Sequence, residues 1–107
     1  MTTGNTNVAL GYQALSLETA GNKSVAIGSN TLQSQNNTST KDVYNTAVGY
    51  LAGSAVTTGD KNTFIGAEAA QTNTVGYKNT ALGFQALTSN ADGSTTVAVG
   101  FRALLSM

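Results

Sequence analysis

Six short stretches of this chain each end in a glycine, and in five of them aliphatic or β-branched residues alternate with alanine. Examples are Val8-Ala9-Leu10-Gly11, Val25-Ala26-Ile27-Gly28 and Val97-Ala98-Val99-Gly100. A hydrophobic period of two, enriched in β-branched residues, is typical of a β-strand. A helix would lose about 1 kcal/mol at each of the glycines. The pattern therefore predicts an all-β chain with six short strands.

The six stretches are copies of one repeat. Aligned on the glycine that ends each strand, the copies begin 17, 21, 17, 17 and 17 residues apart, at Gly11, Gly28, Gly49, Gly66, Gly83 and Gly100. A second glycine comes seven residues earlier in five copies, at Gly4, Gly21, Gly59, Gly76 and Gly93, and Asp42 takes that place in the third. The segments between strands are rich in Gly, Asn, Asp and Ser, which form turns. Residues 1–107 are therefore predicted to form one parallel β-solenoid (a β-roll) of about six coils of 17 residues, with successive strands about 4.8 Å apart.

Stacking converts each position of the repeat into a column of side chains. The residue before the glycine is aliphatic in every copy, and we expect this column to be buried inside the coil: Leu10, Ile27, Val48, Ile65, Leu82 and Val99. The next column on the same side of the strand is aromatic in four copies, at Tyr12, Tyr50, Phe84 and Phe101. Leu15, Leu32, Leu87 and Leu104 add to the expected core.

The opposite side of the strand is also apolar, where a solvent-facing strand would carry polar residues. Its column consists of Ala9, Ala26, Ala47, Phe64, Ala81 and Ala98. We interpret this smooth face as the interface with a neighbouring chain, because a solenoid this small has little core of its own. The alternative is that Ala and Gly simply fit a tight coil.

The interval that leads to the third copy, between Gly28 and Gly49, contains the only insertion, within residues 33–44. Insertions on one side of a solenoid often carry binding specificity. The candidate partner-binding residues are Gln35, Asn36, Asn37, Thr38 and Lys41. A neutral surface bulge is the alternative.

Composition removes most other chemistry. Five basic and five acidic residues give zero net charge, so no field attracts nucleic acid or an anionic membrane. The chain has no His or Cys, no apolar run that could span a bilayer, and no basic segment followed by an apolar run that would indicate a signal peptide. We therefore expect no enzyme, cofactor or metal site. Lys23, Lys61 and Lys78 share one repeat position and either touch an acidic glycan or only keep the rod soluble.

The phrase "SVAIGSNTL", residues 24–32, resembles the head repeats of YadA-type trimeric autotransporter adhesins, and "NTALGFQAL", residues 79–87, is similar to arrays in phage tail fibres. The resemblance covers all six copies. It implies a left-handed β-roll, a homotrimer, and an adhesive head or shaft on a cell or virion surface that contacts a host protein or glycan. The period of 17 is longer than in the best-known heads, which implies a larger solvent-facing loop, and Phe64 departs from the alanine pattern.

Three functions remain open at this point. The first is a structural and adhesive module of a trimeric surface adhesin or tail fibre. The second is an extracellular filament whose subunits add end to end, because a solenoid without caps leaves strand edges open. The third is ice binding, for which the best polar column is interrupted: Thr19, Asn36, Thr57, Thr74 and Ala91.

Overall fold

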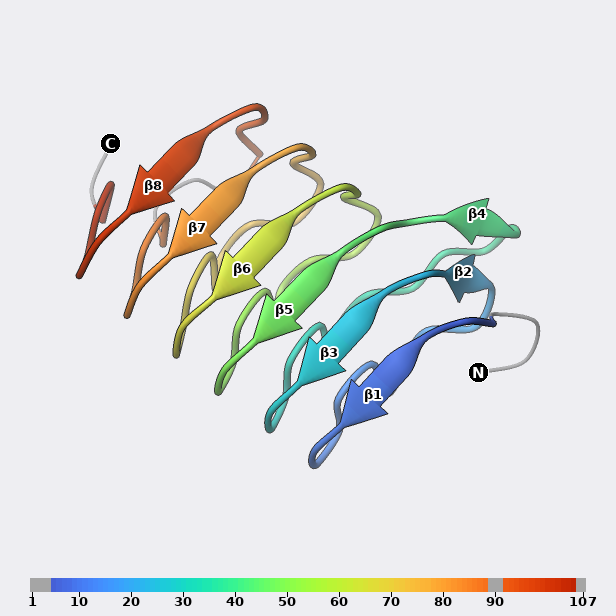
Figure 1. The fold of residues 1–107 in the computed structure, drawn as a ribbon. Coiled ribbons are helices and arrows are strands. Elements are labelled where there is room, and N and C mark those ends of the chain that lie inside the picture. Colours follow the sequence, from blue (N-terminus) through green and yellow to red (C-terminus); the bar gives the residue numbers. More distant parts are fainter. Residues whose placement is uncertain (1–4, 89–91, 106–107) are drawn as a thin grey trace.

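The computed structural model describes residues 5–88 and 92–105, and these residues form a parallel β-solenoid of about five turns. Six strands make the main sheet in chain order: β1 (Val8–Leu10), β3 (Val25–Ile27), β5 (Thr46–Val48), β6 (Thr63–Ile65), β7 (Thr80–Leu82) and β8 (Val97–Val99). A two-stranded sheet pairs β2 (Gly21–Asn22) with β4 (Lys41–Asp42). The described residues contain no helix, and Figure 1 shows the strands side by side along the rod, with the N-terminus at the β1 end and the C-terminus at the β8 end. The predicted all-β solenoid is confirmed.

The strand register follows the repeat. Ala9 pairs with Ala26 on the next strand, 17 positions along the chain, and Ala26 pairs with Ala47 across the insertion, 21 positions along. All five strand pairs of the main sheet are parallel. Equivalent residues of the repeat therefore do lie in columns.

The corners of each turn use left-handed backbone at three columns that are not reserved for glycine. One column has φ between 55° and 63°, at Thr6, Lys23, Tyr44, Lys61, Lys78 and Thr95. The other two contain Gln13 (φ 57°) and Leu15 (φ 55°) with their equivalents in the later turns. Each such residue has a conformation that L-amino acids rarely adopt. The stacking of turns therefore imposes these corners against local preference.

The glycine that ends each strand is needed for two reasons. Gly83 has φ 130°, a region that only glycine occupies readily, and a Cβ at this position would lie 2.5 Å from the carbonyl oxygen of Gly100 in the next turn. Its equivalents in the other turns have φ between 125° and 131°. Gly4, assigned above to the second glycine column, lies outside the described residues.

Buried asparagines link one turn to the next. The Asn45 side chain donates to the carbonyl oxygen of Gly59 (2.8 Å) and accepts from the backbone N–H of Asn62 (2.9 Å). Asn62 repeats this arrangement with Gly76 and Asn79. Each amide thus satisfies a buried donor and a buried acceptor of the following turn, which would otherwise be costly to bury.

The core lies on the opposite side of the strands from the side we predicted. Ala26, Ala47, Phe64 and Ala81 are completely buried, and Ala98 is 3% exposed. They pack inside the coil with Leu15, Leu32 and Leu87. The coil is narrow, with a Cα envelope of 36 × 24 × 16 Å, so the column that faces the leucines is alanine in most turns. The prediction that the Ala column faces a neighbouring chain is therefore wrong for these five residues, and Ala9 is exposed because it lies on the first strand, β1.

Phe64 is accommodated by small residues in the column that faces it. A Cβ added to Gly53 would lie 2.9 Å from Cδ2 of Phe64 and 3.0 Å from Cδ2 of Leu32. Ala70, in the same column as Gly53, is also buried in this cluster. The large ring therefore takes the volume that leucine side chains fill in the other turns, which keeps the core density uniform.

Candidate functional site

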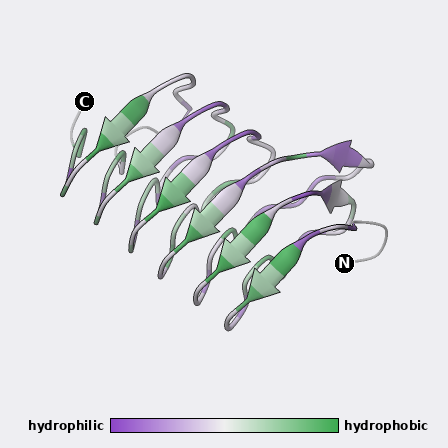
Figure 2. Ribbon diagram, in the orientation of Figure 1, coloured by the Kyte–Doolittle hydropathy of each residue, from purple (hydrophilic) through white to green (hydrophobic). Residues whose placement is uncertain are grey.

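The aliphatic column and the aromatic residues of the next column lie on the outside of the main sheet, together with Val8 and Val97 of the two end strands. We call this surface the apolar face. Leu10 is 65% exposed and Val99 61%, and even the internal strands β6 and β7 leave Ile65 37% and Leu82 44% exposed. The prediction that this column is buried inside the coil is therefore wrong. Figure 2 shows hydrophobic colouring at the end of all six strands of the main sheet, although β5, β6 and β7 begin with paler threonine residues, whereas β4 is hydrophilic.

The apolar face is large for a chain of this size. Its exposed members are Val8, Leu10, Tyr12, Tyr50, Ile65, Leu82, Phe84, Val97, Val99 and Phe101. Given side chains of this size, these fractions leave roughly 1,000 Å² accessible, above the few hundred Å² of an ordinary surface patch. Phe84 and Phe101 stack with ring centroids 5.6 Å apart. The columns that form the face contain no charged residue. Its exposure to water is therefore unfavourable, and its burial against another molecule would lower the free energy.

The insertion is divided into two parts by the pairing of β2 with β4. Gly21 pairs with Lys41 and Asn22 with Asp42, so three extra residues lie before β4 and one lies after it. Asp42 therefore pairs with Asn22. The alignment on glycine predicted that it would lie opposite Gly21, and this prediction is wrong. We call residues 38–41 the insertion loop; Thr38, Ser39 and Thr40 are exposed.

The candidate binding residues of this region point in different directions. Asn36 and Thr38 are exposed, and Lys41 is half-buried. Gln35 is completely buried and Asn37 is 4% exposed. These two cannot reach a partner in this conformation, because their side chains hydrogen-bond inside the coil. Only the exposed part of the predicted set remains available for binding.

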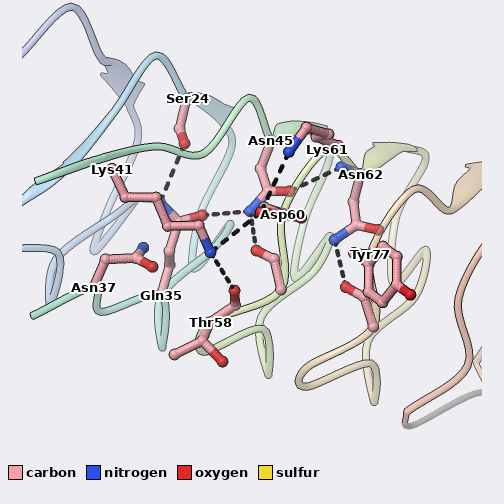
Figure 3. Close-up of polar contacts among 12 residues, drawn as sticks. Ser24, Gln35, Asn37, Lys41, Asn45, Thr58, Asp60, Lys61, Asn62 and Tyr77 are labelled. Atoms are coloured by element: carbon pink, nitrogen blue, oxygen red, sulfur yellow. Dashed lines mark hydrogen bonds and ion pairs between the residues drawn. The ribbon is translucent and has the colours of Figure 1, made fainter. Parts of the chain in front are cut away.

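Charged residues surround the insertion loop in two groups. Lys23 pairs with Asp42 at 2.9 Å, and Lys41 and Lys61 lie 3.2 and 3.5 Å from Asp60. Figure 3 shows Lys41 and Lys61 converging on Asp60, with Lys41 also donating to the Thr58 carbonyl oxygen. The hydrogen bond between Lys23 and Asp42 raises the pKa of Lys23 and lowers the pKa of Asp42.

The predicted lysine column does not form a uniform basic strip. Asp42 pairs with Lys23, and Asp60 is shared between Lys61 and Lys41. Lys78 lies over the ring of Tyr77, 5.8 Å from the centroid. All three lysines occupy the same left-handed corner position. Two of the three charges are therefore paired locally, which weakens attraction to an anionic glycan.

Sequence reasoning missed one buried group. Glu18 is 1% exposed, and its carboxylate accepts hydrogen bonds from the 19–21 turn and from Gln35 and Asn37. The equivalent residues of the later turns, Gln35, Val56 and Asn73, are buried as well, but the sequence gives little sign of this because three of the four residues in the column are polar.

Among residues 5–88 and 92–105, no group of acids forms a metal site and no pocket opens on the surface. No helix in the described part of the chain is long and apolar enough to cross a membrane. The chain matches none of the family models, curated proteins or solved structures with which it was compared. The apolar face and the exposed part of the insertion loop are our two candidate contact surfaces.

Proposed function

We propose that this chain is a non-enzymatic structural and adhesive module, a rod segment of a homotrimeric surface adhesin or phage tail fibre on a cell or virion surface. The observation that carries the proposal is the apolar face, since Leu82 and Ile65 on internal strands are exposed in a single chain. A standard interface buries about 800 Å² on each partner, and the apolar face offers at least that area. The repeats' resemblance to adhesin heads favours three copies around one axis.

The polar side of the rod has a separate role in this proposal. If three apolar faces meet at the axis, the insertion loop and the Lys23–Asp42 pair remain on the outside. A host surface protein or glycan would then contact this side, and neutral polar side chains such as Thr38 and Ser39 suit hydrogen bonding to either. Ice binding has less support, because the hydroxyl groups of Thr19 and Thr57 already donate to neighbouring residues.

Paired charge variants test the interface. Leu82→Asp puts a carboxylate in the middle of the apolar face, where burial against another chain would be strongly unfavourable. Thr58→Asp makes the same charge change on the exposed polar side. We expect sedimentation to show monomeric Leu82→Asp at concentrations where the unmodified chain and Thr58→Asp are trimeric.

Two results would count against the proposal. If Leu82→Asp sediments like the unmodified chain, the apolar face is not the contact between chains. If the unmodified chain forms open-ended fibres that Leu82→Asp preserves, subunits add end to end and the filament alternative is correct.

A further inference from the structure

The buried carboxylate of Glu18 is surrounded only by hydrogen-bond donors. Oε1 accepts from the backbone N–H groups of Thr19 (3.0 Å), Ala20 (3.2 Å), Gly21 (2.8 Å) and Asn37 (2.9 Å). Oε2 accepts from the side chains of Gln35 and Asn37, each at 2.8 Å. A proton on either oxygen would point at one of these donors. The site is therefore built for the ionised form of the carboxylate.

Asn37 connects this carboxylate to the insertion loop. It uses both its backbone N–H and its side-chain amide to bind Glu18, and the exposed residues of the loop begin immediately after it. The Thr19 hydroxyl adds a bond to the carbonyl oxygen of Asn37. Two of the three hydrogen bonds described for Asn37 thus go to Glu18, which anchors the start of the loop.

The Gln35 side chain cannot turn over to accept a hydrogen bond from a protonated Glu18. Gln35 donates to Glu18 and accepts from the Asn45 side chain at 2.8 Å (Figure 3). Asn45 is itself fixed, because it donates to Gly59 and accepts from the backbone of Asn62. If Gln35 rotated by half a turn, its amide nitrogen would face that of Asn45, which is donor against donor. The hydrogen bonds from Asn45 to Gln35 and from Gln35 to residue 18 therefore all run in one direction, and residue 18 must accept the last of them.

We propose that Glu18 is an acid-sensitive latch on the insertion loop: the ionised carboxylate holds Asn37 against the solenoid, and protonation releases the loop while the other turns stay folded. Burial raises the pKa of Glu18, but the hydrogen bonds from Asn37, Gly21 and Gln35 outweigh it, so the pKa lies below its usual value. A lowered pKa in the folded state means that the ionised form stabilises the fold. That stabilisation is present above the unfolded-state pKa and is lost as the pH falls through the folded-state value.

No other titratable group contacts the latch in the described structure. The groups that face Glu18 are backbone amides of the 19–21 turn and the amides of Gln35 and Asn37, and beyond Gln35 lies the Ser24 hydroxyl. The nearby charges, Lys23 and Asp42, pair with each other on the surface. Acid titration of the loop should therefore follow Glu18 itself.

Amide hydrogen exchange in the full chain offers a comparison with internal controls. Three buried backbone N–H groups, those of Asn37, Asn62 and Asn79, each donate a hydrogen bond of 2.9 Å. The acceptor is a carboxylate for Asn37 and a neutral side-chain amide oxygen for the other two. On lowering the pH from about 6 to about 2.5, and after correction for intrinsic exchange, we expect protection of Asn37 to fall about ten-fold or more relative to the other two. Equal loss of protection at all three sites would overturn the latch.

Two variants separate the latch from a general effect of charge. Glu18→Gln places an amide nitrogen opposite Gln35 and Asn37, so Asn37 should exchange rapidly already at neutral pH and respond little to acid. Glu68→Gln makes the same charge change at a partly exposed site that binds Gln85, and should leave Asn37 protected. An unchanged Asn37 in Glu18→Gln would contradict the proposal. If that variant does not fold, the acid titration of the unmodified chain decides the question alone.

Discussion

Replacement of Gly83 by alanine should destabilise the solenoid far more than the same change at Gly100. The two glycines have nearly equal φ angles, 130° and 125°, so both variants pay a similar cost of about 1–3 kcal/mol for the backbone conformation. They differ in what the new methyl group meets. At Gly83 it would lie 2.5 Å from the Gly100 carbonyl oxygen, whereas at Gly100 the nearest atom is Cβ of Ala103, 4.0 Å away.

The extra cost at Gly83 comes from the stacking of turns. Because the obstructing atoms belong to backbone, they cannot rotate away, and β7 must separate from β8. That separation weakens hydrogen bonds such as those from Gly100 N to the Leu82 oxygen and from Thr80 N to the Thr96 oxygen, both 2.8 Å. With each bond worth about 1 kcal/mol, Gly83→Ala should be about 2–4 kcal/mol less stable than Gly100→Ala.

Urea denaturation of both variants at one protein concentration measures this difference, and circular dichroism is a suitable probe of the strands. A difference of this size is a large part of the stability of a small domain, so Gly83→Ala should have a much lower urea concentration at its unfolding midpoint than Gly100→Ala. Equal midpoints for Gly83→Ala and Gly100→Ala would refute the reasoning, because they would mean that turns do not pack at this distance.

Two further changes test the core and the corners. Phe64→Ala should cost about 3–5 kcal/mol by opening a cavity, and Gly53→Leu alone should also destabilise by steric conflict with the ring. The double variant restores the pairing of alanine with leucine found in other turns, so it should be less destabilised than the sum of the two single variants. Simple addition of the two changes in the free energy of unfolding would contradict the contact between Phe64 and Gly53. Lys78 has φ 58°, which Asn tolerates better than Lys and Val tolerates worse. Lys78→Asn should therefore raise the free energy of unfolding by about 0.5 kcal/mol and Lys78→Val should lower it, as thermal melting can show. The opposite order would be inconsistent with a left-handed corner.

The repeat carried most of the information about the fold. A period of 17 residues with one alternating segment per copy predicted parallel strands in register, and the pairing of Val8 with Val25 and of Thr63 with Thr80 agrees. Column positions follow directly from such a register, because each turn places equivalent residues above one another. The left-handed corners at non-glycine residues such as Leu15 were not predicted, since composition gives no sign of them.

The choice between the two sides of the strand failed for a physical reason. Both sides are apolar, and larger side chains usually indicate the core. Here the coil is too narrow for two facing columns of large residues, so alanine faces inward and the aliphatic column faces outward. One signal was available in the sequence: the single large residue of the Ala column, Phe64, occurs where the Leu column contains Gly53 and Ala70. Compensating volumes indicate columns that face each other across one core.

The candidate site was predicted only in its outline. The insertion was evident from the spacing of 21 residues, but its direction was not, and Gln35 and Asn37 prove to be buried. Glu18 escaped notice because an acid in a polar segment is usually solvated. Its burial depends on amides from a turn 17 to 19 residues away, which local sequence does not reveal.

The native mass of the full chain tests the central claim most directly. One chain has a mass of 10.8 kDa. If the apolar face joins three copies, native mass spectrometry should give a species of three times that value, about 32 kDa, over a wide range of protein concentration. A folded, stable species of 10.8 kDa under the same conditions would contradict the account.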